Sequence, residues 1–119
     1  MKIASVDPKE RLPNLADREH PVYSYRNLMV NLPRYWCPHC DEYTVFSIGA
    51  SDPCALSDDV HRQFDALTPT RSTYEQGVSD FLCRGCSRPV RVIYRILEVQ
   101  MASYRYFAEA VLEAEREGG

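Results

Sequence analysis

Two pairs of cysteines are the residues of this chain best suited to chemistry. Cys37 and Cys40 stand in the sequence YWCPHCDEY, and Cys83 and Cys86 stand in the sequence FLCRGCSRP. A Cys-x-x-Cys pair can cycle between a dithiol and a disulfide, and two such pairs can supply four thiolates to one metal ion. The sequence therefore raises two alternatives, a redox-active pair and a metal centre.

The first pair resembles the redox site of the thioredoxin superfamily, above all that of its strongly oxidising periplasmic members. A pair of that type opens a helix, whose N-terminus lowers the pKa of the thiol. The residues after Cys40 read DEYTVF, and their β-branched and aromatic side chains predict a strand instead. Two acids beside the pair also disfavour a reactive thiolate, and a redox pair leaves Cys83 and Cys86 without a role.

The metal alternative uses all four cysteines. Two Cys-x-x-Cys pairs supply a tetrahedral site with four thiolate ligands, and zinc is its usual occupant. Pro38 fixes φ inside the first turn, and Gly85 relaxes the second. Asp41 and Ser87 follow the last cysteine of each pair, where the chain often needs a residue that tolerates an unusual φ. A third alternative is that the four cysteines are structural thiols that bind no metal.

On these residues the chain resembles the zinc ribbon family, with Cys37-Pro38-His39-Cys40 as the first knuckle and Cys83-Arg84-Gly85-Cys86 as the second. The resemblance covers the knuckles and the strands that follow them. It implies one structural zinc ion in a coordinatively closed site, with no place for a catalytic water. The chain departs from the family because 42 residues separate the knuckles, whereas ribbons commonly have about 15–20 there. We place the extra length in an insertion.

The pattern of the remaining residues predicts an α+β fold. Ser57 is a typical helix N-cap, and the apolar face after it predicts a short helix that ends before Pro69. The segments 42–48 and 88–99 alternate between two faces, which is typical of strands. Apolar spacing in the tail predicts a C-terminal helix from near Ser103, with a returning strand as the alternative. We expect a small zinc-ribbon-like antiparallel sheet with a helix-bearing insertion and a C-terminal helix.

Length and composition predict one folded domain. The chain has 119 residues, 45% of them hydrophobic, and a net charge of −3. We expect residues 1–20 to form a loosely ordered arm and residues 21–119 a single domain, with the insertion at about 50–80. No segment reads as a signal peptide or a membrane span, so we expect a cytoplasmic protein with no membrane partner.

The sequence shows no catalytic constellation, and we therefore expect no enzyme. It contains no zinc deaminase signature, no G-x-S-x-G, no P-loop and no dinucleotide-binding glycine pattern. We interpret His39 as a solvent-facing knuckle residue and His61 as part of a solvated helix face. Cys54, the fifth cysteine, we interpret as a free thiol.

Charge along the chain suggests a protein-binding function. Residues 50–82 carry a net charge of −4 and residues 83–105 a net charge of +4. The second knuckle leads into an aromatic tail, SYRYFAEAVLE. In this feature, in size and in charge, the chain resembles bacterial toxin-immunity proteins built on ribbon scaffolds, which implies that a toxin or effector is its partner. Acidic inserts suit basic targets. The expected contact residues are the acids of the insertion, Asp52, Asp58, Asp59, Asp65 and Glu75.

The alternative function is a nucleic-acid-binding or transcription-associated zinc ribbon. It would hold phosphate groups with an arginine band. The band consists of Arg84, Arg88, Arg91 and Arg95. Lysine is nearly absent and the flanking stretches are acidic, which favours arginines that pair with Asp and Glu over a phosphate-binding surface.

Overall fold

The computed structural model describes residues 2–13, 20–23, 33–46, 56–69, 76–100 and 103–115. In chain order its elements are β1 (Ile3–Val6), the 3-10 helix η1 (Pro8–Glu10), β2 (His20–Tyr23), β3 (Arg34–Cys37), β4 (Glu42–Val45), α1 (Asp58–Leu67), β5 (Gln76–Leu82), β6 (Pro89–Gln100) and β7 (Ser103–Ala114). These elements form two antiparallel sheets and one α-helix. The α+β fold class is therefore confirmed.

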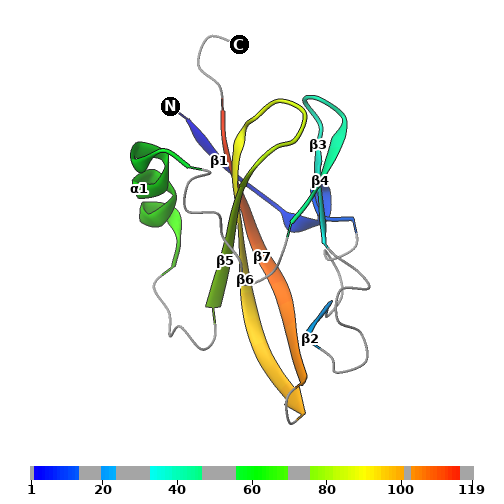
Figure 1. Ribbon diagram of the computed structural model, residues 1–119. Helices are drawn as coiled ribbons and strands as arrows, with labels where there is room; N and C mark the ends of the chain where they lie inside the picture. Colours follow the sequence, from blue (N-terminus) through cyan, green and yellow to red (C-terminus); the bar gives the residue numbers. More distant parts are fainter. Residues whose placement is uncertain are drawn as a thin grey trace.

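The main sheet is built around β6 and β7, which pair with each other over strands of 12 residues each (Figure 1). Its strand order is β1-β7-β6-β5, and β2 also pairs with β7. β1 lies against the C-terminal end of β7, with Ile3 opposite Ala114, whereas β2 lies near its beginning, with His20 opposite Tyr106. Three other strands thus pair with β7, which makes it the centre of the sheet.

The second sheet is the two-stranded hairpin of β3 and β4. The turn of this hairpin holds the first cysteine pair, and the turn between β5 and β6 holds the second. Figure 1 shows the two turns side by side at one end of the molecule, opposite the tip of the β6–β7 hairpin. Two hairpins that are far apart in sequence thus present their turns to each other.

The main sheet is buried on both faces around residues 90–94 of β6. Val90, Val92 and Tyr94 of β6 pack in one cluster with residues of the β3–β4 hairpin. Ile93 packs in a second cluster with residues of α1. The alternation in the sequence of β6 is confirmed, and it separates two apolar layers because neighbouring residues of a strand face opposite sides.

α1 forms where the sequence predicts it. The Ser57 side chain accepts a hydrogen bond from the Val60 N–H at 3.3 Å, and the helix ends at Leu67, before Pro69. At the other end the Thr68 hydroxyl donates to the Phe64 carbonyl at 2.7 Å. Both ends are therefore closed by local hydrogen bonds. In the described part of the chain no helix has the length and apolar character to cross a membrane.

Replacing Phe64 with alanine is expected to lower the free energy of unfolding by about 3–5 kcal/mol. The Phe64 ring is fully buried in the cluster between α1 and the main sheet, so its loss leaves a cavity. Urea denaturation followed by circular dichroism measures the change. The matched control is Leu67→Ala on the same helix, because Leu67 is 53% exposed and its truncation should cost about 0.5 kcal/mol or less. Equal losses in the two variants would contradict this packing.

The expected C-terminal helix is wrong, since residues 103–114 form β7. Helix propensities differ by only tenths of a kcal/mol per residue, so tertiary pairing can override them. Val111 and Leu112 are neighbours in sequence and both are buried, one in each apolar layer. A strand buries such neighbours on opposite faces, which a helix with one apolar side does not.

The structure places residues 2–13 of the expected N-terminal arm against the rest of the fold. β1 pairs with β7, and the Glu115 N–H donates to the Lys2 carbonyl at 2.8 Å. Leu12 is fully buried in the cluster under the β3–β4 hairpin. The segment is polar in sequence, but its few apolar side chains and its backbone have partners that lie far along the chain, in β7 and in the hairpin.

Candidate metal centre

The two cysteine turns have the same backbone geometry. In the first turn the Asp41 N–H donates to the Cys37 carbonyl at 2.8 Å, and in the second the Ser87 N–H donates to the Cys83 carbonyl at 2.8 Å. Asp41 has φ of 56° and Ser87 has φ of 60°, in the left-handed region that few side chains adopt. The expectation that these two positions tolerate an unusual φ is confirmed.

The four cysteine sulfurs converge on one point between the turns. They lie within 4.8 Å of one another, with Cys40 Sγ 3.5 Å from Cys83 Sγ and Cys37 Sγ 3.9 Å from Cys86 Sγ. A tetrahedral site with zinc–sulfur bonds of about 2.3 Å separates its sulfurs by about 3.8 Å. A disulfide would require about 2.05 Å. The four thiols are free, and their spacing and soft donor atoms fit one zinc ion.

Packing brings the two turns together next to these sulfurs. Phe46 beyond β4 stacks on Phe81 of β5 with ring centroids 4.9 Å apart. The Arg84 N–H of the second turn donates to the Thr44 hydroxyl of β4 at 2.8 Å. These contacts join the hairpins through groups other than the thiols, so the ligand set is partly preorganised.

Gly85 lies directly over one of the sulfurs. A Cβ atom at this position would approach Cys40 Sγ to 2.5 Å and the Glu42 side chain to 2.8 Å. Contacts this short force a neighbouring atom to move. From the sequence, Gly85 is expected to give the backbone of the turn conformational freedom. The structure shows that the position also lacks room for any side chain.

Gly85→Ala is therefore expected to weaken zinc binding by about 10- to 100-fold, the range seen when groups around the ligands are disturbed. The added methyl group displaces the sulfur of Cys40 from the ligand set. Competition with a chromophoric chelator measures the affinity. His39→Ala is the control, because His39 is exposed in the first turn and should bind zinc as the unchanged chain does. An unchanged affinity of Gly85→Ala would contradict the geometry of the centre.

The thiols differ in acidity. Burial raises the pKa of Cys83, but hydrogen bonds from the backbone of Cys86 and Gly85 outweigh burial and bring the pKa down to about 7. Burial raises the pKa of Cys40 to about 12, and the hydrogen bond with Cys83 acts in the same direction. Burial also raises the pKa of Cys86. The metal-free cluster therefore holds protons at neutral pH, and a metal ion must displace them.

Next to the cysteines lies a buried carboxylate that sequence reasoning missed. Glu113 of β7 is 2% exposed. It accepts a hydrogen bond from the Tyr35 hydroxyl, forms an ion pair with Arg11 at 2.8 Å and forms another with Arg88 at 3.0 Å. The signal in the sequence is one acid inside the apolar run AVLEA. Glu113 thus ties together the N-terminal segment, β3, the second knuckle and β7.

Arg88 connects this cluster to the cysteines. Burial alone would lower the pKa of Arg88, but the charges of Glu113, Tyr35, Cys37 and Cys86 outweigh burial and raise it. Burial raises the pKa of Tyr35, and its hydrogen bond to Glu113 raises that pKa further. The Arg88 side chain therefore stays charged and offsets negative charge on the carboxylate and on the thiolates.

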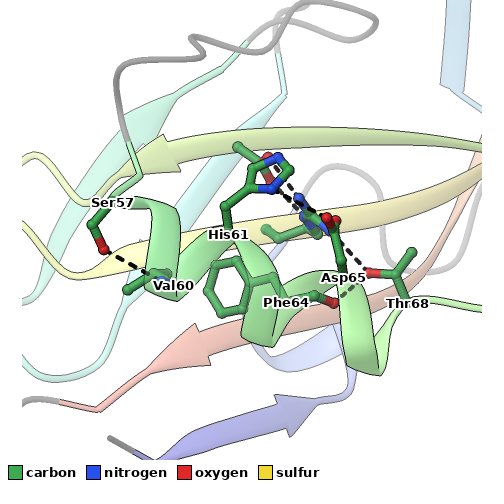
Figure 2. A network of polar contacts seen from close by, with 8 residues as sticks. Ser57, Val60, His61, Phe64, Asp65 and Thr68 are labelled. Atoms are coloured by element: carbon green, nitrogen blue, oxygen red, sulfur yellow. Dashed lines mark hydrogen bonds and ion pairs between the residues drawn. The ribbon is translucent and has the colours of Figure 1, made fainter.

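Arg91 is held under α1 by a second buried network. It is 2% exposed, and its guanidinium donates to Asp80 at 2.7 Å and to Asp65 at 2.7 Å. Figure 2 shows Asp65 at the end of α1 near His61 and Thr68, and His61 Nδ1 lies 3.1 Å from the Asp65 carboxylate. Burial lowers the pKa of Arg91, but the hydrogen bonds and charges of the two carboxylates raise it on balance. This network anchors α1 to the sheet.

The four arginines of the expected phosphate-binding band are in different environments. Arg84 is exposed in the second turn, whereas Arg88 pairs with Glu113 and Arg91 is buried. Arg95 lies 3.5 Å from the carboxylate of Glu109. The described residues therefore show no continuous exposed band of arginines.

The acids expected to contact a partner fall into two groups. Asp58 and Asp59 are exposed in the first turn of α1. Asp65 is half-exposed and already engaged by Arg91 and His61. Asp52 and Glu75 lie outside the described residues, as does Cys54.

Comparison with known proteins returns no relative. The chain matches no family model, no curated protein and no solved structure. The resemblance to zinc ribbons therefore rests on the residues and geometry of the two knuckles, and the four cysteines within metal-binding distance are consistent with a zinc-binding site.

Proposed function

We propose that this chain is a non-catalytic protein-binding module of the zinc-ribbon type, held closed by one zinc ion. The observation that carries the proposal is the convergence of four cysteine sulfurs from two matching turns. Four thiolates complete a tetrahedral zinc site and leave no open position for a reacting water. Elemental analysis of the purified, untagged chain is expected to find one zinc ion per chain. Absence of stoichiometric metal would contradict the proposal.

We further propose that the partner is a basic protein, such as a bacterial toxin or effector that this chain neutralises in the cytoplasm. The support is the placement of α1, which Arg91 fixes to the sheet while Asp58 and Asp59 face solvent. A fixed acidic turn favours association with a positively charged surface. The band of arginines required for nucleic-acid binding is interrupted by ion pairs, which favours the protein partner over the nucleic acid.

Capture of partners from the source cell, with and without nuclease, tests this function. We expect one stoichiometric basic protein that remains bound after nuclease treatment. The double substitution Asp58→Asn with Asp59→Asn should weaken this binding at least tenfold. The charge-matched control is the double substitution Glu10→Gln with Glu115→Gln, at two exposed acids outside α1. Binding lost with nuclease, or a steep fall of affinity with salt for an oligonucleotide, would favour the nucleic-acid function instead.

A further inference from the structure

Two pairs of sulfurs from different knuckles lie close together. Cys40 Sγ lies 3.5 Å from Cys83 Sγ, and Cys37 Sγ lies 3.9 Å from Cys86 Sγ. A disulfide needs about 2.05 Å between sulfurs. Of these two pairs, the sulfurs of Cys40 and Cys83 have the shorter distance to close before a disulfide can form, about 1.5 Å.

Access to solvent distinguishes the two sulfurs of this pair. Cys83 is 2% exposed, whereas Cys40 is partly exposed. The residue over Cys40 Sγ is Gly85, which is itself exposed and covers the sulfur with backbone atoms alone. A small oxidant therefore reaches Cys40 first, and Cys83 lies behind it as the second thiol.

We propose that the centre is a redox switch in which a peroxide converts Cys40 and Cys83 to a disulfide between the knuckles and the zinc ion is released. The inference rests on the proposed zinc centre. Oxidation of two ligands to a disulfide leaves Cys37 and Cys86 as the remaining thiolates. Two thiolates do not complete the tetrahedral set that a structural zinc site requires.

The chemistry balances with a peroxide as the oxidant. In the zinc-loaded centre Cys40 would be a thiolate, because metal binding displaces its proton. This thiolate attacks one peroxide oxygen, the O–O bond breaks, and the departing hydroxide takes a proton and leaves as water, so that Cys40 becomes a sulfenic acid. The Cys83 thiolate then attacks the Cys40 sulfur, the S–O bond breaks, and this hydroxide leaves as a second water. Two electrons pass from the two sulfurs to the peroxide.

The switch keeps the hairpins joined after the ion has left. The disulfide links the same two turns that the ion linked. With this disulfide in place of the ion, we expect the bond from the Arg84 N–H to the Thr44 hydroxyl and the stack of Phe46 on Phe81 to be kept, since neither contact uses a thiol. A thiol reductant together with zinc should therefore restore the centre.

The test exposes the zinc-loaded, full-length chain to hydrogen peroxide. A chromophoric chelator follows released zinc, and peptide mass spectrometry identifies the disulfide. The experiment is run on the unchanged chain and on Cys54→Ser, which removes the fifth cysteine from the mapping, with peroxide destroyed by catalase as the control. We expect release of one zinc ion per chain, a Cys40–Cys83 cross-link, and full rebinding of zinc after reduction.

Two results would overturn the switch. One is a disulfide within a single knuckle, Cys37–Cys40 or Cys83–Cys86, or irreversible oxidation to sulfinic acids. The other is a zinc-loaded chain that keeps its ion in peroxide. A chain that purifies without metal would contradict the zinc centre and the switch together, so the failures of the two proposals are distinguishable.

Discussion

Removal of zinc from the proposed centre is expected to unfold this protein. Zinc binding to a small domain contributes on the order of 10 kcal/mol to folding, which is comparable to the total stability of about 5–15 kcal/mol of ordinary domains. Four thiols surround the site, and Cys37 and Cys83 are buried. Without the ion, the junction between the two hairpins loses its strongest link. Thermal melting followed by circular dichroism, with and without a zinc chelator, measures this effect.

Cysteine substitution should give the same result without a chelator. Cys83→Ser removes one buried ligand, and we expect the variant to purify without zinc and to lack a cooperative melting transition. Cys54→Ser is the matched control, since the zinc site uses the other four cysteines, and it should retain zinc and melt as the unchanged chain does. A melting temperature that no chelator alters would contradict the architecture in which the ion closes the fold.

Glu113→Gln is expected to lower the free energy of unfolding by about 3–5 kcal/mol even with zinc bound. The substitution keeps the size of the side chain but removes the charge that faces Arg11 and Arg88. Both guanidinium groups are largely buried, with side chains 15% and 14% exposed. Breaking such a cluster removes the carboxylate that faces two largely buried guanidinium groups. Water cannot replace this carboxylate in a buried site. Urea denaturation in excess zinc isolates this effect from metal loss.

A carboxylate in a less buried ion pair on the same strand provides the control. Glu109, itself 22% exposed, lies 3.5 Å from Arg95, whose side chain is 49% exposed. Ion pairs of this kind contribute about 0–1 kcal/mol, so Glu109→Gln should change stability little. If the two substitutions had equal effects, the cluster around Glu113 would not be the link between the N-terminal segment, the second knuckle and β7 that its contacts indicate.

The four-cysteine cluster could be predicted from sequence because its geometry is local within each knuckle. Two residues between cysteines set the turn, and the backbone bond from the residue after the second cysteine closes it. Asp41 and Ser87 take positive φ as their position in the turn demands. The sequence does not predict how little space separates Gly85 from Cys40 Sγ. The atoms that exclude a side chain at Gly85 belong to the other knuckle and to the residues after it.

Buried charges could not be assigned from sequence. In sequence Arg91 is one member of an arginine band, yet in the structure it is 2% exposed and is held by Asp80 and Asp65. Its partners come from a neighbouring strand and from the helix of the insertion. An arginine in an alternating strand looks the same in sequence whether its face meets water or a helix, and only the packing of α1 distinguishes the two.

By itself the sequence determined the features that depend on local interactions. These are the two knuckles, the capped helix α1 and the alternating strand β6. Tertiary structure decided the conformation of the tail and of the N-terminal segment. Residues 103–114 have the composition of a helix and form β7, because β6 and β1 offer backbone partners and two apolar layers offer burial. Those partners lie far away along the chain, and the free energy they supply exceeds the small local preferences that a sequence pattern records.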